Sequence, residues 1–186
     1  MEFTADALER AKNIKMVIFD VDGVLTDGGI YIGEKGELYK SFFCRDGMGI
    51  TLWHRAGLQT AIITGRESVM LANRAKELKI GAVWQGRHDK RAAYAELKEQ
   101  FSLDDAAIAY IGDDIIDLPL MLQAGLAAAV SDAASEAREA AQLISAAPGG
   151  RGAVREILEF ILKAQGRWAA LVADFMGPKP IEKIAQ

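Results

Sequence analysis

The sequence predicts an α/β fold in which a central parallel sheet lies between two layers of helices, a three-layer sandwich. Short apolar runs rich in valine and isoleucine alternate with amphipathic stretches of helical period. This alternation is typical of parallel strands joined by crossover helices. The length of 186 residues suits one domain with its own hydrophobic core. We therefore expect a single domain over residues 1–166 and a C-terminal tail over residues 167–186.

Five apolar runs have the length and composition of buried strands, and a shorter sixth one is expected at 142–145. The five runs are 15–20, 60–64, 82–85, 108–112 and 126–130. Amphipathic stretches fill the gaps, and several of them end at a glycine, the residue that most often terminates a helix. The expected helices begin at about Thr4 and then cover 49–57, 68–81, 90–101, 118–125, 135–142 and 153–166.

Two segments depart from the alternation. Residues 28–43, GGIYIGEKGELYKSFF, have alternating side chains on both sides of a Glu-Lys-Gly turn. This pattern predicts a β-hairpin inserted directly after the first strand. After Gly166 the pattern fades, and we expect the tail to contain a single apolar turn.

Composition and charge exclude several classes of protein. A net charge of −4 offers no electrostatic surface for nucleic acid. The single cysteine, Cys44, excludes an internal disulfide framework and fits a reducing compartment. Residues 1–13 lack the basic and apolar regions of a signal peptide, and no apolar run approaches the roughly 20 residues that span a membrane. A cytoplasmic protein without membrane or nucleic-acid partners is expected.

Polar side chains follow the strands at the positions where a ligand would bind. In an open parallel sheet the ligand crevice lies beyond the carboxyl ends of the strands, where the strand order reverses. Four polar clusters converge on that edge. They are Asp20 and Asp22 after the first strand, Thr64 at the end of the second, Lys90 at the start of the helix after the third, and Asp113, Asp114 and Asp117 after the fourth.

Several carboxylates in one partly desolvated crevice require a positive partner. Like charges about 4 Å apart cost several kcal/mol at an effective dielectric near 20. An all-oxygen set suits Mg²⁺, whereas the thiolates and paired imidazoles that zinc prefers are missing. With Mg²⁺ bound, a carboxylate can approach a phosphoryl group as a nucleophile. Helix capping by Asp22 or Asp114 is the plain alternative, but capping does not require this order of motifs.

The four clusters DVDGV, ITG, Lys90 and GDDIID, in that order, resemble the motifs of the haloacid-dehalogenase-like phosphohydrolases. The resemblance extends from about residue 15 to residue 165 and implies a Rossmann-like sheet. It implies that Asp20 is the nucleophile and that Asp22 protonates the leaving oxygen and later deprotonates the hydrolytic water. Thr64 and Lys90 would hold the phosphoryl oxygens in transit.

The same resemblance implies the ligands of the cation. Mg²⁺ would be held by the carboxylate of Asp20, the backbone carbonyl of Asp22 and the carboxylate of Asp113. Asp114 and Asp117 would order the metal-bound waters and orient the lysine of the third motif.

No cap domain fits this sequence, so other parts of the protein have to select the substrate. Many members of this superfamily carry a cap of dozens of residues, but here the two insertion points hold only the hairpin and the residues GRH (86–88). The cap-less hairpin form, together with RDG, QG, GGRGAVRE and LKAQG, closely resembles the family of 3-deoxy-D-manno-octulosonate 8-phosphate phosphatases of lipopolysaccharide inner-core synthesis. That likeness implies a homotetramer whose hairpins build a central barrel and whose C-terminal tails reach neighbouring active sites.

The likeness also implies contacts to a phosphorylated sugar acid, whose two anionic groups call for guanidinium side chains. A surface charge is about equally expected for Arg74. The glycines around Arg151 are expected to form either an anion-binding loop or a plain entry turn of a helix. The implied substrate contacts are Asp22, Arg45, Asp46, Gly47, Gly65, Arg66, Arg74 and Lys90.

Other functions stay open at this point. A receiver-like phospho-accepting domain also places acids, Mg²⁺, a threonine and a lysine on a parallel sheet. The acid two positions after Asp20 favours turnover over storage of the phosphoryl group. A phosphatase of a related nonulosonate 9-phosphate would differ only in its sugar. A non-catalytic activator domain of the same hairpin form is disfavoured by the intact Asp20, Asp22, Lys90 and Asp113.

Overall fold

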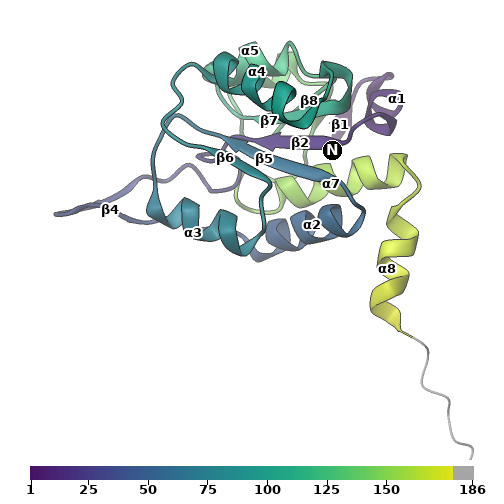
Figure 1. Ribbon diagram of the computed structural model, residues 1–186, viewed down its shortest axis with the longest axis horizontal. Coiled ribbons are helices and arrows are strands. Elements are labelled where there is room, and N and C mark those ends of the chain that lie inside the picture. Colours follow the sequence, from purple (N-terminus) through teal and green to yellow (C-terminus); the bar gives the residue numbers. More distant parts are fainter. Residues whose placement is uncertain (178–186) are drawn as a thin grey trace, which may run out of the picture.

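The computed structural model describes residues 1–177 and has the expected α/β architecture, a sheet between two helical layers (Figure 1). In this part of the chain the main sheet has seven strands in the order β1-β9-β8-β7-β2-β5-β6. All neighbouring strands run parallel except β1, which is antiparallel to β9. The strands are β1 (Glu2–Phe3), β2 (Met16–Phe19), β5 (Gln59–Ile63), β6 (Ala82–Trp84), β7 (Ile108–Gly112), β8 (Leu126–Ala129) and β9 (Leu143–Ile144).

Each face of the sheet is covered by its own helices, because alternate residues of a strand point to opposite faces. In β2, Val17 and Phe19 belong to the cluster with α1, α2, α3 and α7, whereas Met16 and Ile18 belong to the cluster with α4, α5 and α6. In Figure 1, α2, α3 and α7 lie below the sheet and α4 and α5 above it. The helices are α1 (Ala7–Lys12), α2 (Cys44–Arg55), α3 (Val69–Glu77), α4 (Lys90–Phe101), α5 (Leu118–Met121), α6 (Ser135–Ala140) and α7 (Ala153–Ala164), with 3₁₀ turns at Asp105–Ala107 and Ile115–Asp117.

Strand β2 is the point where the strand order reverses. Its last residue, Phe19, pairs with Ile62 of β5 on one side and with Ile111 of β7 on the other. The three strands therefore end at the same level, and the residues that follow them meet at one edge. This is the position at which open α/β sheets bind ligands.

The predicted hairpin is confirmed as a separate two-stranded sheet of β3 (Tyr31–Gly33) and β4 (Gly36–Tyr39). It projects from the body of the molecule beyond the end of β2 (Figure 1). The rings of Tyr31 and Tyr39 stack at a centroid distance of 4.2 Å. Within residues 1–177 the only insertion between β2 and α2 is this hairpin, so the expectation of an open sheet edge without a cap domain is confirmed.

The C-terminal segment differs from the expected tail with one apolar turn. It forms the helix α8 (Trp168–Met176), in which Leu171 is buried. Trp168 packs against the core, and the guanidinium of Arg155 lies 5.0 Å from the centroid of its ring. The start of this segment is therefore attached to the domain, because its apolar side chains find room beside α7. The expected tail residues 178–186 lie outside the described residues.

Several boundaries were also wrong. Strand β1 was not expected, and the first helix begins at Ala7 rather than at Thr4. Helix α2 begins at Cys44, several residues before the expected start, so the RDG segment lies in its first turn. The helix expected over 118–125 ends at Met121. A two-residue strand such as β1 is too short to carry any periodicity, and its pairing with β9 is a contact between distant parts of the chain.

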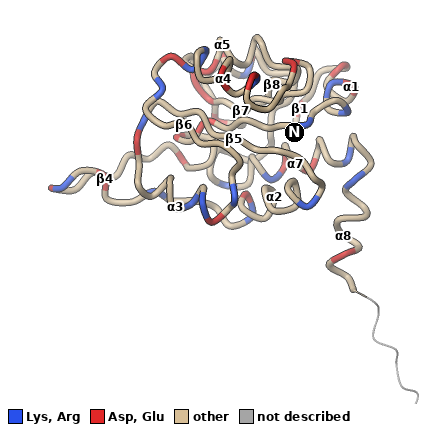
Figure 2. Tube along the Cα trace, in the orientation of Figure 1, with Lys and Arg blue, Asp and Glu red and all other residues tan. Residues whose placement is uncertain are grey.

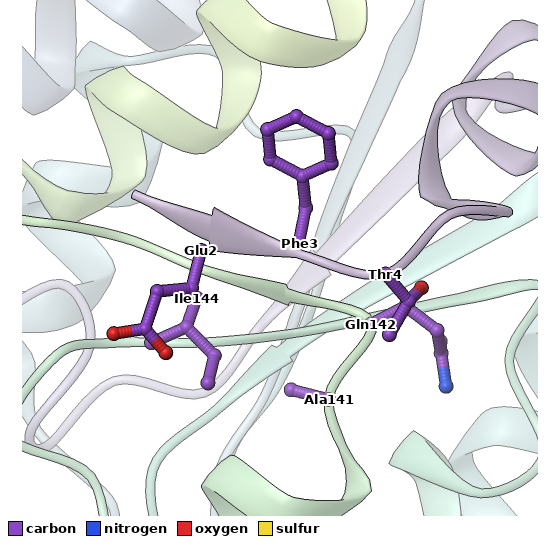
Figure 3. Close-up of a pocket in the computed structure, with 6 residues that line it drawn as sticks. All are labelled: Glu2, Phe3, Thr4, Ala141, Gln142 and Ile144. Carbon is purple, nitrogen blue, oxygen red and sulfur yellow. The ribbon is translucent and has the colours of Figure 1, made fainter.

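A shallow pocket of about 220 Å³ lies at the edge of the sheet formed by β1 and β9 (Figure 3). Figure 3 shows Glu2 and Phe3 on opposite sides of β1. None of its lining residues belongs to the polar clusters that follow the central strands, so this pocket is not the candidate site. The lining residues are Glu2, Phe3, Thr4, Ala141, Gln142 and Ile144.

No helix within residues 1–177 combines the length and the apolar character needed to cross a membrane.

Candidate active site

A buried ion pair between Asp20 and Lys90 forms the centre of the candidate site. Asp20 directly follows β2, and its side chain is 6% exposed. Lys90 is the first residue of α4, whose N-terminus is capped by the carboxylate of Asp89. The ammonium of Lys90 donates to Oδ1 of Asp20 at 2.8 Å and to Oδ1 of Asp117 at 2.7 Å. The fold therefore brings together three of the predicted residues from three separate elements.

Asp117 is fully used in holding this arrangement. Its Oδ1 also accepts a hydrogen bond from the Tyr110 hydroxyl at 2.6 Å, and its Oδ2 accepts from the backbone N–H groups of Asp113 and Asp114. Since both oxygens are occupied, Asp117 orients Lys90 and stabilises the turn after β7 more readily than it would bind a cation. Asp114 is exposed and its carboxylate caps the short 3₁₀ turn by accepting from the N–H of Ile115 at 2.7 Å.

The carboxylate of Asp113 is the open group of the cluster. Within residues 1–177 no hydrogen-bond donor contacts it, although oxygens of Asp20, Asp113 and Asp117 all lie within 4.8 Å of one another. Gly23 makes room for it, because a Cβ on Gly23 would lie 2.0 Å from Oδ2 of Asp113. The donor set consists of carboxylate oxygens, which Mg²⁺ prefers. The cluster therefore fits a magnesium site with Asp20 and Asp113 as direct ligands.

The ionisation of the cluster points to the same cation. Burial, together with the neighbouring carboxylates of Asp20 and Asp117, raises the pKa of Asp113 to about 8. Burial also raises the pKa of Asp20 to about 6, although Lys90 opposes this shift. Burial would lower the pKa of Lys90, but the two carboxylates that face it outweigh burial and raise it. One lysine thus leaves an excess of negative charge that a divalent cation would compensate.

In the metal-free protein the free energy of unfolding should decrease as the pH rises from about 4 to about 8. The folded state keeps protons on Asp20 and Asp113 that the unfolded chain has already released, so the unfolded state binds fewer protons in this range. Mg²⁺ replaces those protons, and the gain in melting temperature on its addition should therefore grow with pH. Melting curves with chelator and with Mg²⁺ measure both slopes.

Asp113→Asn is the control for this experiment, because it should flatten the metal-free slope and remove most of the gain from Mg²⁺. If neither Mg²⁺ nor chelator changed the melting temperature near pH 8, the assignment of the cluster as a Mg²⁺ site would be contradicted.

Asp22 lies beside the central ion pair and faces two cations. Its carboxylate accepts from the ammonium of Lys40, on the hairpin, and its Oδ2 lies 3.5 Å from Nε of Arg66. Thr64 is buried directly after β5, and its hydroxyl lies 3.5 Å from the backbone N–H of Arg66. Gly65 has His88 as its nearest neighbour, 3.6 Å from the position of a Cβ. The ITGR segment therefore lines the same edge of the sheet, as expected.

Asp46, an expected substrate contact, has hydrogen-bond partners in another part of the fold. It is buried, and its two oxygens accept from the backbone N–H groups of Gly152 and Arg155 at 3.1 and 2.8 Å. It therefore caps the N-terminus of α7, where an acid is favourable. Burial raises its pKa, although these hydrogen bonds oppose the shift. Arg45, one residue earlier, is exposed and forms no ion pair within residues 1–177.

Gly47 and Arg74 form a pair of their own. A Cβ on Gly47 would lie 2.5 Å from Nη2 of Arg74, so a larger residue there would displace this guanidinium. Arg74 also pairs with Glu77 at 2.8 Å. Its Nε is buried and has no hydrogen-bond partner in the described part of the chain. The RDG segment thus contacts α3. Within residues 1–177 Arg74 forms no hydrogen bond or ion pair with Asp20, and its role in binding stays a prediction.

The glycine-rich segment before α7 supports the loop that carries Asp22. A Cβ on Gly149 would lie 1.7 Å from the carbonyl oxygen of Gly23, and the N–H of Gly150 donates to the carbonyl of Val24 at 2.9 Å. The segment leads into α7, as expected for the entry turn of a helix. Its glycines are also needed for this close backbone contact, which the sequence did not indicate.

Gly149→Ala should destabilise the protein by about 3 kcal/mol or more, because backbone rather than a flexible side chain occupies the space of the new methyl group. Urea denaturation measures the change. Gly33→Ala is the matched control, since its nearest neighbour would be Leu38 at 3.4 Å, and we expect a much smaller loss there. Equal losses in the two variants would contradict the packing role of Gly149.

Two residues of the site were missed from the sequence. Tyr110 lies inside β7, where its hydroxyl contacts Lys90 and Asp117; an aromatic residue in a buried strand is ordinary core by its pattern. Lys40 lies at the end of the hairpin and had no motif to mark it. A charged residue next to alternating apolar positions is usually solvated, so no local signal distinguished it.

Acidic and basic segments both lie at the end of the sheet from which the hairpin projects (Figure 2).

Known proteins share the sequence and the fold of this chain. Residues 81–157 match the haloacid dehalogenase-like hydrolase family. A Yersinia pestis protein named 3-deoxy-D-manno-octulosonate 8-phosphate phosphatase KdsC is 46% identical over 162 residues, which cover 87% of each chain. The chain belongs to this phosphatase family.

Other members of the phosphatase family agree in sequence and in structure. The KdsC protein of Escherichia coli strain K12 is 42% identical over 164 residues, 88% of this chain and 87% of its own. The crystal structure of the Moraxella catarrhalis phosphatase, in complex with magnesium ion, phosphate ion and a KDO molecule, has a TM-score of 0.89 and 39% identity over 92% of this chain and 99% of its own. The predicted family, its fold and its class of reaction, hydrolysis of a phosphate monoester, are confirmed.

Proposed function

We propose that this chain hydrolyses 3-deoxy-D-manno-octulosonate 8-phosphate to the free sugar acid and inorganic phosphate, for lipopolysaccharide inner-core synthesis. The observation that carries the proposal is the group formed by the buried Asp20, Lys90 and Asp117 and the half-buried Asp113 at the point of strand reversal. The relatives named for this reaction support the choice of sugar. The lone cysteine, Cys44, is consistent with a reducing compartment such as the cytoplasm.

The chemistry divides into two transfers. An oxygen of Asp20 attacks phosphorus, and the ester bond breaks as Asp22 donates a proton to the leaving sugar oxygen. The phosphoryl group then resides on Asp20. Asp22, now ionised, takes a proton from a water molecule that attacks the same phosphorus, which releases phosphate and restores both carboxyl groups. Lys90 and Thr64 hold the phosphoryl oxygens in both steps.

The residues that would hold Mg²⁺ are Asp20 and Asp113 through their carboxylates and Asp22 through its backbone carbonyl. When bound, the cation compensates the negative charge that nucleophile and ester bring together. Asp117 would keep Lys90 aimed at Asp20 through the contacts described above.

We propose that Arg45, Arg66 and Arg74 select the sugar acid by binding its carboxylate and hydroxyl groups, with Asp46 and Gly47 shaping the segment that carries Arg45. Arg66 supports this most directly, because its guanidinium reaches Asp22 while half of its side chain is exposed. Asp46 acts in this proposal through the α7 cap rather than by touching the sugar.

A homotetramer is proposed as the working form, with hairpins facing one another and C-terminal segments reaching neighbouring sites. The side chains of Ile32 and Leu38 on the hairpin are 72% and 62% exposed, and an isolated two-stranded hairpin is marginal in water. Sedimentation equilibrium measures the number of subunits, and a monomer with full activity would contradict this form.

The function is tested by a screen of phosphorylated sugars with Mg²⁺ or with chelator, read as released phosphate over many turnovers. The proposal expects the 8-phosphate of the octulosonate to be hydrolysed fastest, and only with the metal. Faster release from a nonulosonate 9-phosphate would reassign the sugar. A single stoichiometric phosphorylation without turnover would indicate a phospho-accepting switch instead.

A further inference from the structure

The hairpin places the buried side chain of Lys40 beside Asp22, the proposed acid–base residue. The side chain of Lys40, which directly follows β4, is only 2% exposed. Its ammonium contacts the carboxylate of Asp22 and lies 3.1 Å from Oε1 of Glu37. Lysine is almost never this buried unless its charge is paired. Here one ammonium joins the hairpin to the loop that follows β2.

Lys40 is itself held from a second direction. Glu37 accepts a hydrogen bond from the hydroxyl of Ser68, which in turn caps α3 by accepting from the N–H of Leu71 at 3.2 Å. The N–H of Ser68 donates to Oε1 of Gln85 at 2.7 Å. A continuous set of polar contacts therefore runs from the start of α3 through the hairpin to Asp22.

The other cation beside Asp22 is held much less firmly. Arg66 lies 3.5 Å away through Nε, and its side chain is 49% exposed. An exposed guanidinium at that distance is free to turn toward a substrate anion, and a surface contact of this kind contributes little to order. Lys40 has no comparable freedom, because its ammonium is enclosed and has carboxylates on two sides. Arg66 is therefore suited to binding a substrate anion, and Lys40 to holding Asp22 in place.

We propose that Lys40 is a positioning residue for Asp22: it holds the carboxyl group in the orientation from which a proton reaches the leaving oxygen, and Glu37 and Ser68 hold Lys40. The inference rests on the proposed function, in which Asp22 is the general acid. It assigns the hairpin a task inside its own subunit, in addition to the proposed contact between subunits. Lys40 is not expected to touch the phosphoryl group.

Leaving-group dependence distinguishes positioning from a merely structural role. A sugar alkoxide needs a proton as it leaves, whereas p-nitrophenolate leaves readily without one, so only the first ester depends strongly on a general acid. The measurement is the single-turnover rate of phosphoryl transfer to the enzyme, by rapid quench, for 3-deoxy-D-manno-octulosonate 8-phosphate and for p-nitrophenyl phosphate. Wild-type turnover of the sugar ester tests the proposed function, and the ratio of the two rates among variants tests the role of Lys40.

Lys40→Met should slow transfer from the sugar ester at least about tenfold and transfer from the aryl ester less than about threefold. On an Asp22→Asn background the same substitution should cause no further loss with the sugar ester, since interacting residues are not additive. Lys40→Arg should recover most of the lost rate. Lys35→Met, at the exposed turn of the same hairpin, is the matched control and should leave both rates unchanged.

Glu37→Gln is a second test of the positioning role if the melting curve shows that Lys40→Met does not fold. It keeps the shape of the side chain but weakens the hold on Lys40, and it should produce a smaller loss that is again selective for the sugar ester. Two results would overturn the proposal. Equal slowing of both esters would indicate that Lys40 supports the site in general. An equally large effect of Lys40→Met on the Asp22→Asn background would indicate that Lys40 binds phosphate directly.

Discussion

Asp20→Asn should reduce turnover at least about a thousandfold, the order of loss seen when a nucleophile is removed from an enzyme. An amide cannot attack phosphorus, yet asparagine has the shape of aspartate and Lys90 keeps its contact with Asp117. The protein should therefore fold and still bind phosphate. Steady-state release of phosphate measures the loss, and mass spectrometry of acid-quenched wild-type enzyme should find one phosphoryl group on Asp20.

Asp104→Asn is the matched control for this substitution. Asp104 is exposed and makes no capping hydrogen bond at the 3₁₀ turn that follows it, so the same change of charge should leave turnover intact. Substantial activity in Asp20→Asn, with an intact Asp104 control, would remove the aspartyl-phosphate mechanism.

Lys90→Met should damage both stability and activity. It leaves the buried carboxylates of Asp20 and Asp117 without their shared cation, and breaking a buried ion pair from one side typically costs about 3–5 kcal/mol. Turnover should fall at least about a hundredfold, because the donor that holds the phosphoryl oxygens is lost. Urea denaturation and phosphate release measure the two effects separately.

Lys98→Met on the same helix is the control. Lys98 pairs with Asp105 near the surface, where its side chain is 26% exposed, and exposed pairs contribute at most about 1 kcal/mol. A Lys90 variant no less stable than the Lys98 variant would contradict the central role of this ion pair.

Much of the site could be predicted because it is built from residues that directly follow strands. Asp20, Thr64 and Asp113 each follow a strand of the central sheet, and parallel strands bring their carboxyl ends to one edge whatever the intervening sequence. Lys90 was predictable for a related reason, since α4 starts on the loop from β6 at that edge. The alternation of short apolar runs with amphipathic stretches was likewise sufficient for the layers of the fold.

The sequence did not indicate contacts between parts of the chain that are far apart. The carboxylate of Asp46 caps α7, more than a hundred positions later, and its expected contact with substrate stays a prediction. The apolar residues of α8 were expected to form only a turn, yet Leu171 is buried in the domain core. Nothing in the local pattern of either segment distinguishes these outcomes, because each depends on which distant element is adjacent.

The sequence by itself determined the class of fold, the family and the set of chemical groups, because periodicity and motif order are local properties of the chain. Only the tertiary structure decided how those groups are paired: Lys90 with Asp20 and Asp117, Lys40 with Asp22, and Gly149 against Gly23. The physical reason is that burial and close contact set the energy of a charge or a methyl group, and both depend on elements that only the folded chain brings together.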